Sequence, residues 1–247
     1  MKRSRKILFG LSALLTIGCA TVVLANFWKS KLVVEHVTVS GATIVETEDV
    51  LNRAKVPLGA RMVDVDLHAV ENRVAAHPYV SRVLVERNLP STIHIEIVER
   101  RPLALLNGRE LRYVDRDGFV LPNSVSRELF DLPVITGLPA AQATKPGTEI
   151  TNADLDEAIQ ILETSKAVGR ELYHLISEIQ IRNGGDIVLY TTDGGVPVLF
   201  GRGGVPRKLV ALETFWSTIV AERGPQSLTY VDLRFEDQVV ARWKKKT

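Results

Sequence analysis

Charged residues are missing from one long early stretch of the chain. Residues 7–28 contain no Asp, Glu, Lys or Arg, and most of them are apolar. A helix over this range is about 33 Å long, which is enough to cross a hydrocarbon core of about 30 Å. The pattern predicts a single transmembrane helix at 7–28, preceded by a short tail at 1–6.

The charges on either side of this stretch predict its orientation. Four basic residues lie within 1–6, against two within 29–31. The more basic flank of a membrane span usually stays in the cytoplasm. Phe27 and Trp28 lie where interfacial aromatic residues are expected. We therefore expect a single-pass protein of the inner membrane, with a cytoplasmic amino terminus and a periplasmic remainder.

Two alternatives to a retained anchor are a cleaved signal peptide, with its cleavage site at Val23-Leu24-Ala25, and a lipoprotein signal that ends at Cys19. The apolar run is longer than the roughly 7–15 residues of a typical signal peptide. Thr16 is unusual before a lipoprotein cysteine, and apolar sequence continues after it. A retained anchor is therefore favoured. Cys19 is the only cysteine, so the exported part has neither a disulfide nor a thiol nucleophile.

Residues 32–100 have the periodicity of a small two-layer unit. The predicted elements are a strand at 32–39, a helix after Thr47, a helix opened by Asp66, and strands at 80–86 and 92–98. In the last strand Ile93, Ile95 and Ile97 share the side that faces the core. The order is strand, helix, helix, strand, strand, with both helices on one face of the sheet.

Residues 101–247 predict a second unit, rich in strands. Turn dipeptides at Asn107-Gly108, Asp117-Gly118 and Asp193-Gly194 suit tight hairpins, so we expect a mainly antiparallel sheet. Expected helices cover 152–167 and 206–222. Expected strands lie within 103–120 and at 177–181, 187–191, 196–200, 229–235 and 238–243, whereas 133–146 is interpreted as a loop. The predicted fold class of the whole chain is α+β.

Composition and motifs give no support to catalysis. The chain is 24% charged with a formal net charge of +2, which lacks the basic excess of a nucleic-acid binder. Catalytic signatures are missing, and the five histidines are scattered. Asp64, Asp66 and His68 resemble a metal cluster, but Asp66 is better explained as a helix cap. The glycine-rich run at 201–204 is better explained as a tight turn before a helix than as a phosphate site. We expect no enzyme activity, cofactor or metal.

The last two predicted strands are the most informative candidate for binding. The strand at 238–243 has no successor along the chain, so we expect it to form an edge of the sheet. An edge strand with unpaired backbone groups can accept a strand from another protein. Phe235 and Trp243 would flank that edge as aromatic anchors.

Several motifs spread over nearly the whole chain carry a family resemblance. They are Val37-x-Val39-x-Gly41, His77-Pro78-Tyr79-Val80, Arg87-Asn88-Leu89-Pro90-Ser91, Val98-Glu99-Arg100-Arg101-Pro102, Tyr113-Val114-Asp115-Arg116-Asp117-Gly118 and Tyr230-Val231-Asp232-Leu233-Arg234-Phe235. In these motifs and in its layout the chain resembles the FtsQ/DivIB family of bacterial cell-division proteins. The resemblance implies a POTRA domain at 32–100 and an FtsQ-type β-domain at 101–247.

The resemblance also implies a function. Proteins of this family are inner-membrane scaffolds at the division septum that link early and late division proteins. Their β-domain recruits the partners FtsB and FtsL through its last strand, and their POTRA domain contacts other division proteins. The implied partner-binding residues of this chain are Arg234, Phe235, Gln238, Val239, Val240, Ala241 and Trp243. Phe235 and Trp243 match an aromatic-x₇-Trp pattern of the family.

Two other classes of function compete with a division scaffold. A POTRA-containing component of protein export or outer-membrane assembly commonly has repeated POTRA units or a following barrel, and the sequence indicates neither. A periplasmic enzyme would need a convergent polar site, which the sequence does not indicate.

Overall fold

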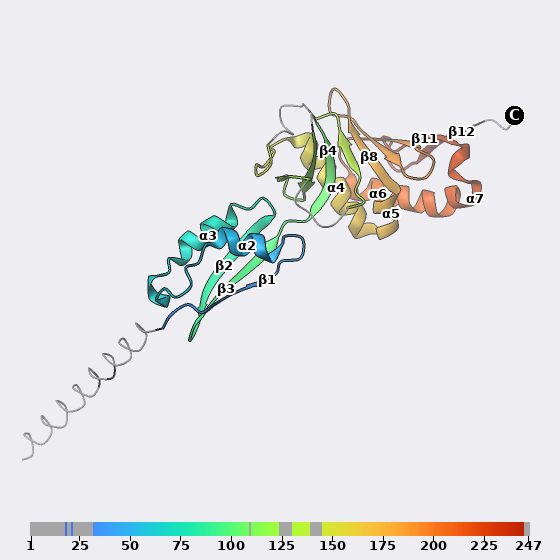
Figure 1. The fold of residues 1–247 in the computed structure, drawn as a ribbon. Coiled ribbons are helices and arrows are strands. Elements are labelled where there is room, and N and C mark those ends of the chain that lie inside the picture. Colours follow the sequence, from blue (N-terminus) through green and yellow to red (C-terminus); the bar gives the residue numbers. More distant parts are fainter. Residues whose placement is uncertain are drawn as a thin grey trace, which may run out of the picture. The chain divides into compact units, whose positions relative to one another are not determined.

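The computed structural model describes residues 18, 21, 32–108, 110–123, 130–138 and 145–244. The chain divides into two compact units, Met1–Glu99 and Arg100–Thr247 (Figure 1). The predicted tail and span at 1–28 lie outside the described residues, apart from Gly18 and Thr21. Within the part that is described, no helix is both long enough and apolar enough to cross a membrane.

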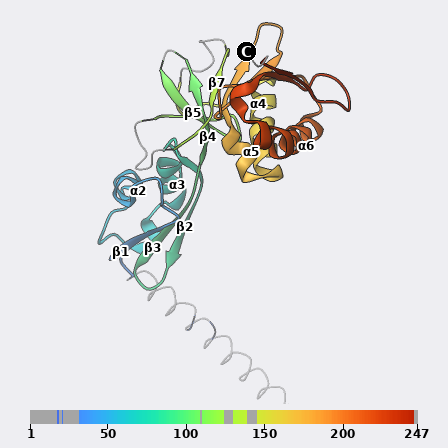
Figure 2. The same ribbon diagram turned by 90° about the vertical axis from the view of Figure 1, so that its right-hand side faces the viewer.

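The first unit has the predicted order of elements. They are β1 (His36–Ser40), α2 (Thr47–Ala54), a 3₁₀ turn (Met62–Asp64), α3 (Leu67–Ala75), β2 (Val80–Asn88) and β3 (Thr92–Glu99). The sheet order is β1-β3-β2, with β1 parallel and β2 antiparallel to the central β3. Figures 1 and 2 show α2 and α3 on one face of this sheet.

The core of the first unit follows from the alternation in β3. Ile93, Ile95 and Ile97 are fully or almost fully buried, as predicted. Val50 of α2 and Val70 of α3 are buried with them, because each lies on the apolar face of its helix. Asp66 caps α3 by accepting a hydrogen bond from the N–H of Ala69 (3.0 Å), so the prediction of a helix cap is confirmed.

The second unit combines one long sheet with helices. Its strands are β4 (Pro102–Asn107), β5 (Leu111–Asp115), β6 (Val120–Leu121), β7 (Val134–Thr136), β8 (Ile176–Ile181), β9 (Ile187–Thr191), β10 (Pro197–Gly201), β11 (Leu228–Asp232) and β12 (Val240–Trp243). Its helices are α4 (Ala153–Val168), α5 (Arg170–Leu175), α6 (Val205–Phe215) with a π-helical turn (Trp216–Val220), α7 (Ala221–Arg223) and a 3₁₀ turn (Pro225–Ser227).

The sheet is mixed. Its order is β12-β11-β10-β9-β8-β7-β4-β5-β6. The expected antiparallel pairs are present, but β10–β11, β4–β7 and β7–β8 are parallel. Turn dipeptides predict only hairpins between consecutive strands, so they carry no signal for parallel pairing of distant strands.

The second unit differs from the expectations in three details. The predicted loop at 133–146 contains β7, which is only three residues long and pairs in parallel with β4 and β8. The short helix α5 begins directly after Gly169 and was not predicted. The helix predicted over 206–222 contains a π-helical turn at Trp216–Val220, which has one residue more than an α-helical turn. As a result Val220, and not Ile219 (40% exposed), faces the core.

Candidate functional site: an open sheet edge

The last strand forms an edge of the sheet in the second unit. β12 pairs in antiparallel register with β11, and Ala241 lies opposite Val231. Among the strands of the described residues, none pairs with the other side of β12. The expectation of an edge strand at this position is therefore confirmed.

The direction of the backbone groups along β12 follows from one hydrogen bond. The N–H of Lys244 donates to the C=O of Ser227 (2.7 Å), so Lys244 faces the strand side occupied by β11. The register with β11 shifts between Leu228 and Tyr230, but the extra residue belongs to β11. Along β12 itself, successive residues therefore direct their backbone groups to alternate sides. Val240 and Arg242 therefore direct their backbone groups toward β11, whereas Ala241 and Trp243 direct theirs toward the open side.

The side chains of β12 alternate in a second direction. Val240 (37% exposed) and Arg242 face solvent, whereas Ala241 and Trp243 pack against the core. The Trp243 ring contacts Phe215 of α6 with ring centroids 6.4 Å apart, and the Arg223 guanidinium lies 5.1 Å from its centroid. Trp243 thus contributes to packing of the unit as well as to the edge.

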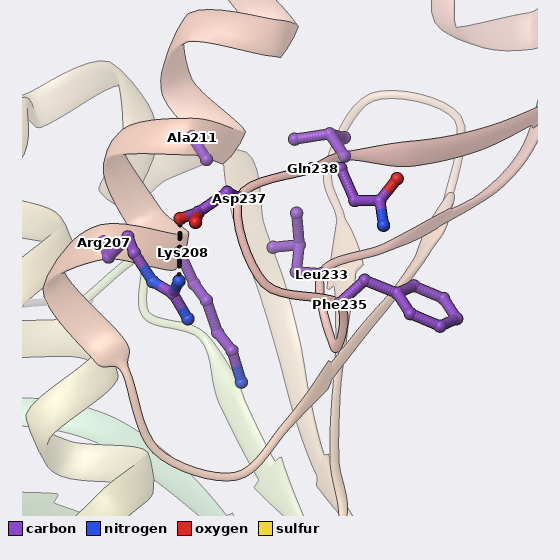
Figure 3. Close-up of a pocket in the computed structure, with 8 residues that line it drawn as sticks. Arg207, Lys208, Ala211, Leu233, Phe235, Asp237 and Gln238 are labelled. Carbon is purple, nitrogen blue, oxygen red and sulfur yellow. Dashed lines mark hydrogen bonds and ion pairs between the residues drawn. The ribbon is translucent and has the colours of Figure 1, made fainter.

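Phe235 lies in the segment that joins β11 to β12 and is 50% exposed. This segment turns through Asp237, whose positive φ of 56° places it in the left-handed region. A cavity of about 260 Å³ beside the segment is lined by Arg207, Lys208, Ala211, Leu233, Phe235, Asp237, Gln238 and Val239. Figure 3 shows the Phe235 ring and the Gln238 amide extending away from Arg207 and Lys208.

Arg234 is already engaged within the chain. Its Nε and Nη2 donate to the two carboxylate oxygens of Asp232 at 2.9 and 2.7 Å. The hydrogen bonds from Arg234 lower the pKa of the buried Asp232 carboxyl. Among the hydrogen bonds of the described residues, those of Arg234 use its backbone N–H, Nε and Nη2, and all three go to Asp232.

Sequence reasoning missed the contribution of α6 to this site. Arg207 pairs with Asp237 (3.0 Å) and closes one side of the cavity. Lys208 is buried, and its Nζ donates to the carbonyls of Phe200 (2.7 Å) and Arg202 (2.8 Å). Burial lowers the pKa of Lys208. In the sequence, Arg207 and Lys208 stand out only as cations in the first turn of the helix that became α6. That position does not show that they contact the segment 233–239.

The glycine-rich run at 201–204 is a turn between β10 and α6, as predicted. Two of its donor groups already have anionic partners in the chain. Arg202 pairs with Asp154 and with Glu157, and the N–H of Gly203 donates to Glu157 (2.6 Å). Protein carboxylates therefore occupy the place that a phosphate would need. Over the described ranges, no group of three or more His, Cys, Asp or Glu residues is arranged to hold a metal ion.

The predicted site residues differ in accessibility. Arg234, Phe235, Gln238 and Val240 are exposed, whereas Val239, Ala241 and Trp243 are partly buried. The structure brings all seven together at one end of the sheet, in β12 and in the segment before it.

Comparison with known proteins covers both units. The family described as "POTRA domain, FtsQ-type" matches residues 32–100, and the family described as "Cell division protein FtsQ/DivIB, C-terminal" matches residues 104–234. The second match ends at Arg234, before β12.

Relatives that match over most of their length give the same result. The chain is 32% identical to a cell division protein FtsQ of Salinibacter ruber, over 94% of this chain and 91% of the relative. It is 30% identical to that of Rhodothermus marinus, over 88% and 80%, and 28% identical to that of Geotalea daltonii, over 98% and 88%. The chain belongs to the FtsQ/DivIB family of cell-division proteins.

Proposed function

We propose that this protein is a scaffold of the division machinery that recruits FtsB, together with FtsL, by strand addition at β12. The observation that carries the proposal is the open edge of β12, with the backbone groups of Ala241 and Trp243 directed outward. A strand from a partner would pair with those groups and extend the sheet by one strand. The exposed Phe235 beside the edge would supply an apolar contact.

Only part of the site is free to contribute binding energy. Half of the Phe235 side chain is exposed. Removing this side chain should therefore disturb the packing of the unit less than removing Trp243 would. Trp243 is already packed against Phe215. We therefore assign the aromatic contact with the partner mainly to Phe235, and to Trp243 the additional role of holding β12 on the unit.

The proposal includes anchoring in the inner membrane by residues 7–28, with the two units in the periplasm at the division septum. The uncharged stretch and the basic bias before it support this placement. The POTRA domain would contact other division proteins. The proposal includes no reaction, cofactor, metal or nucleic acid. Membership of a division family favours this role over protein export or outer-membrane assembly.

Site-specific photo-crosslinking in growing cells tests the docking site. A photoreactive amino acid replaces Arg242, whose side chain is exposed on β12, or Phe235. The matched control is Val210, which is 51% exposed on α6. We expect FtsB adducts from positions 242 and 235 and none from 210. Adducts from 210 alone would place the partner on another face of the unit.

Protease treatment of spheroplasts tests the anchor. The protein should remain with the membrane fraction, and residues 32–247 should be digested in intact spheroplasts. A soluble product with a new amino terminus near Asn26 would support the cleaved signal peptide instead.

A further inference from the structure

The three most exposed large apolar side chains of the described residues all belong to the first unit. Leu58 is 67% exposed, Leu89 59% and Val63 52%. Leu58 and Val63 belong to the loop between α2 and α3, and Leu89 belongs to the turn between β2 and β3. Single exposed apolar residues are common on soluble proteins, but several of them in loops at the same end of a unit can form a contact surface. We call these three residues the apolar tip.

Backbone hydrogen bonds hold the apolar tip next to the first described residues of the unit. The bonds run from Gly59 N–H to Val34 C=O (2.8 Å), from Met62 N–H to Leu32 C=O (2.8 Å), and from Glu35 N–H to Ser91 C=O (2.8 Å). Each residue of the tip is thus no more than two residues along the chain from a residue that is hydrogen-bonded to the segment 32–36. Figures 1 and 2 show the loop and the turn at the same end of the unit as this segment.

The segment 32–36 in turn lies close to the proposed span. Only three residues separate Leu32 from Trp28, the last residue of the predicted helix. An extended chain advances at most about 3.6 Å per residue, so Leu32 lies within about 14 Å of the end of the span. The headgroup layer outside the hydrocarbon core is itself about 5–8 Å thick. The apolar tip is therefore confined to the neighbourhood of the membrane surface.

We propose that the apolar tip inserts into the headgroup layer of the membrane in which the chain is anchored, so that the partner of this surface is lipid. The inference rests on the proposed anchor at 7–28. Leu58, Val63 and Leu89 would lose contact with water there, as the apolar side chains of interfacial segments do. The contact would give the first unit a defined orientation on the membrane.

Two arginines next to the tip are already engaged within the chain. Arg61 forms a bidentate pair with Asp64, at 2.7 and 2.9 Å. Arg87 donates to the carbonyls of Met62 (2.7 Å) and Val65 (2.6 Å). Because these guanidinium groups are already engaged, we expect insertion to depend little on anionic lipid.

The test measures the depth of spin labels in the full chain reconstituted in vesicles at low protein-to-lipid ratio. Leu58→Cys, Val63→Cys and Leu89→Cys are labelled one at a time in a Cys19→Ser background. Controls are Leu84→Cys on β2 (47% exposed) and Val210→Cys on α6 (51% exposed). Depth is read from the ratio of collisions with oxygen to collisions with a nickel chelate. The vesicles contain phosphatidylcholine alone or mixed with phosphatidylglycerol.

We expect the oxygen-to-nickel ratio at each tip position to exceed that at both controls by at least about threefold, because the polar chelate is excluded from apolar surroundings. The two lipid compositions should give the same result. A label on Cys19 in the otherwise unchanged chain reports the anchor separately. If Cys19 is inside the bilayer and the tip labels match Leu84→Cys, the lipid contact is wrong and the anchor stands. If Cys19 itself is in water, the anchor is wrong and the lipid contact with it.

Discussion

At the scale of single residues, the two aromatic residues of the β12 edge have different roles. Phe235 is half exposed and lies in a connecting segment, whereas Trp243 packs against Phe215 and lies under Arg223. The aromatic-x₇-Trp pattern treats them as a pair, because a sequence gives residue types but not the direction of each side chain. The direction follows from the register with β11, which only the structure provides.

Alanine substitutions should separate these roles. Phe235→Ala should weaken FtsB binding about thirtyfold, the loss typical of a hot-spot aromatic, with little change in thermal stability. Trp243→Ala should weaken binding and also lower the melting temperature, because it removes packing against the core. Titration with the periplasmic segment of FtsB and calorimetric melting of the full chain measure the two effects. Equal affinity of Phe235→Ala and the unchanged chain would remove Phe235 from the site.

His77 makes a pH-dependent contribution to the first unit. It is buried, its Nδ1 accepts a hydrogen bond from the N–H of Tyr79 (3.1 Å), and its Nε2 lies 3.1 Å from Asp49. Burial lowers the pKa of His77 below its ordinary value of 6.5, and the nearby Arg53 lowers it further. The unfolded chain therefore binds the proton more readily, so this contribution to stability is complete above pH 6.5 and is lost as the pH falls.

We expect the urea midpoint of the full chain to fall between pH 7 and pH 5, and to fall less in His77→Asn. Asparagine is neutral throughout this range and keeps an acceptor near the position of Nδ1. His68→Asn is the matched control, because the side chain of His68 is 92% exposed. The same pH dependence in His77→Asn and the unchanged chain would show that another group causes it.

At the scale of elements, the sequence predicts the long periodic segments better than the short ones. α4 and the strands of the first unit were expected from spacing, because several turns or alternations repeat the same signal. β7 has three residues, too few to show alternation. Gly169 separates α5 from α4, and the apolar residues of α5 continue directly into β8, so sequence alone does not show where the helix ends. Parallel pairing of β10 with β11 depends on contacts distant in sequence.

The edge strand itself gives a sharp prediction with proline. Because the N–H of Ala241 faces the open side of β12, Ala241→Pro should remove a donor to the partner and leave the ladder with β11 intact. Val240→Pro should instead remove a donor to β11 and lower the melting temperature. We expect Ala241→Pro to lower FtsB affinity more than about tenfold, as loss of strand pairing should. Val240→Ala and Ala241→Ser serve as side-chain controls.

The reverse result would overturn this assignment. If Val240→Pro blocks binding with no loss of stability and Ala241→Pro binds normally, the opposite set of backbone groups faces the partner. If both proline variants fold and bind normally, recruitment does not proceed by strand addition at β12. Circular dichroism of each variant shows whether it is folded.

At the scale of the whole molecule, Glu99 and Arg100 are adjacent residues at the boundary between the units, and each forms hydrogen bonds within its own unit. The Glu99 carboxylate accepts hydrogen bonds from the N–H groups of Thr43, Ile44 and Val45, between 2.8 and 3.0 Å. Arg100 donates to the buried Asp115 of the second unit (2.8 Å). Burial raises the pKa of Glu99, but the hydrogen bonds from Thr43, Val45 and Ile44 outweigh it and lower the pKa overall.

These contacts predict that residues 32–100 fold alone and that Glu99 stabilises them. Their buried core comes from within the unit, so the fragment should give a dispersed amide spectrum.

Glu99→Gln should lower the melting temperature of this fragment at pH 7, because the amide cannot accept all of these hydrogen bonds. A carboxyl whose pKa is lowered on folding stabilises the folded state at pH values above its ordinary pKa of 4.5. This stabilisation disappears as the pH falls through the lowered pKa of the folded state. The difference between Glu99→Gln and the unchanged fragment should therefore shrink with falling pH. The control is Glu96→Gln, at an exposed position of β3, which should leave the melting temperature unchanged. An undispersed spectrum of the unchanged fragment would mean that the first unit needs the second unit to fold.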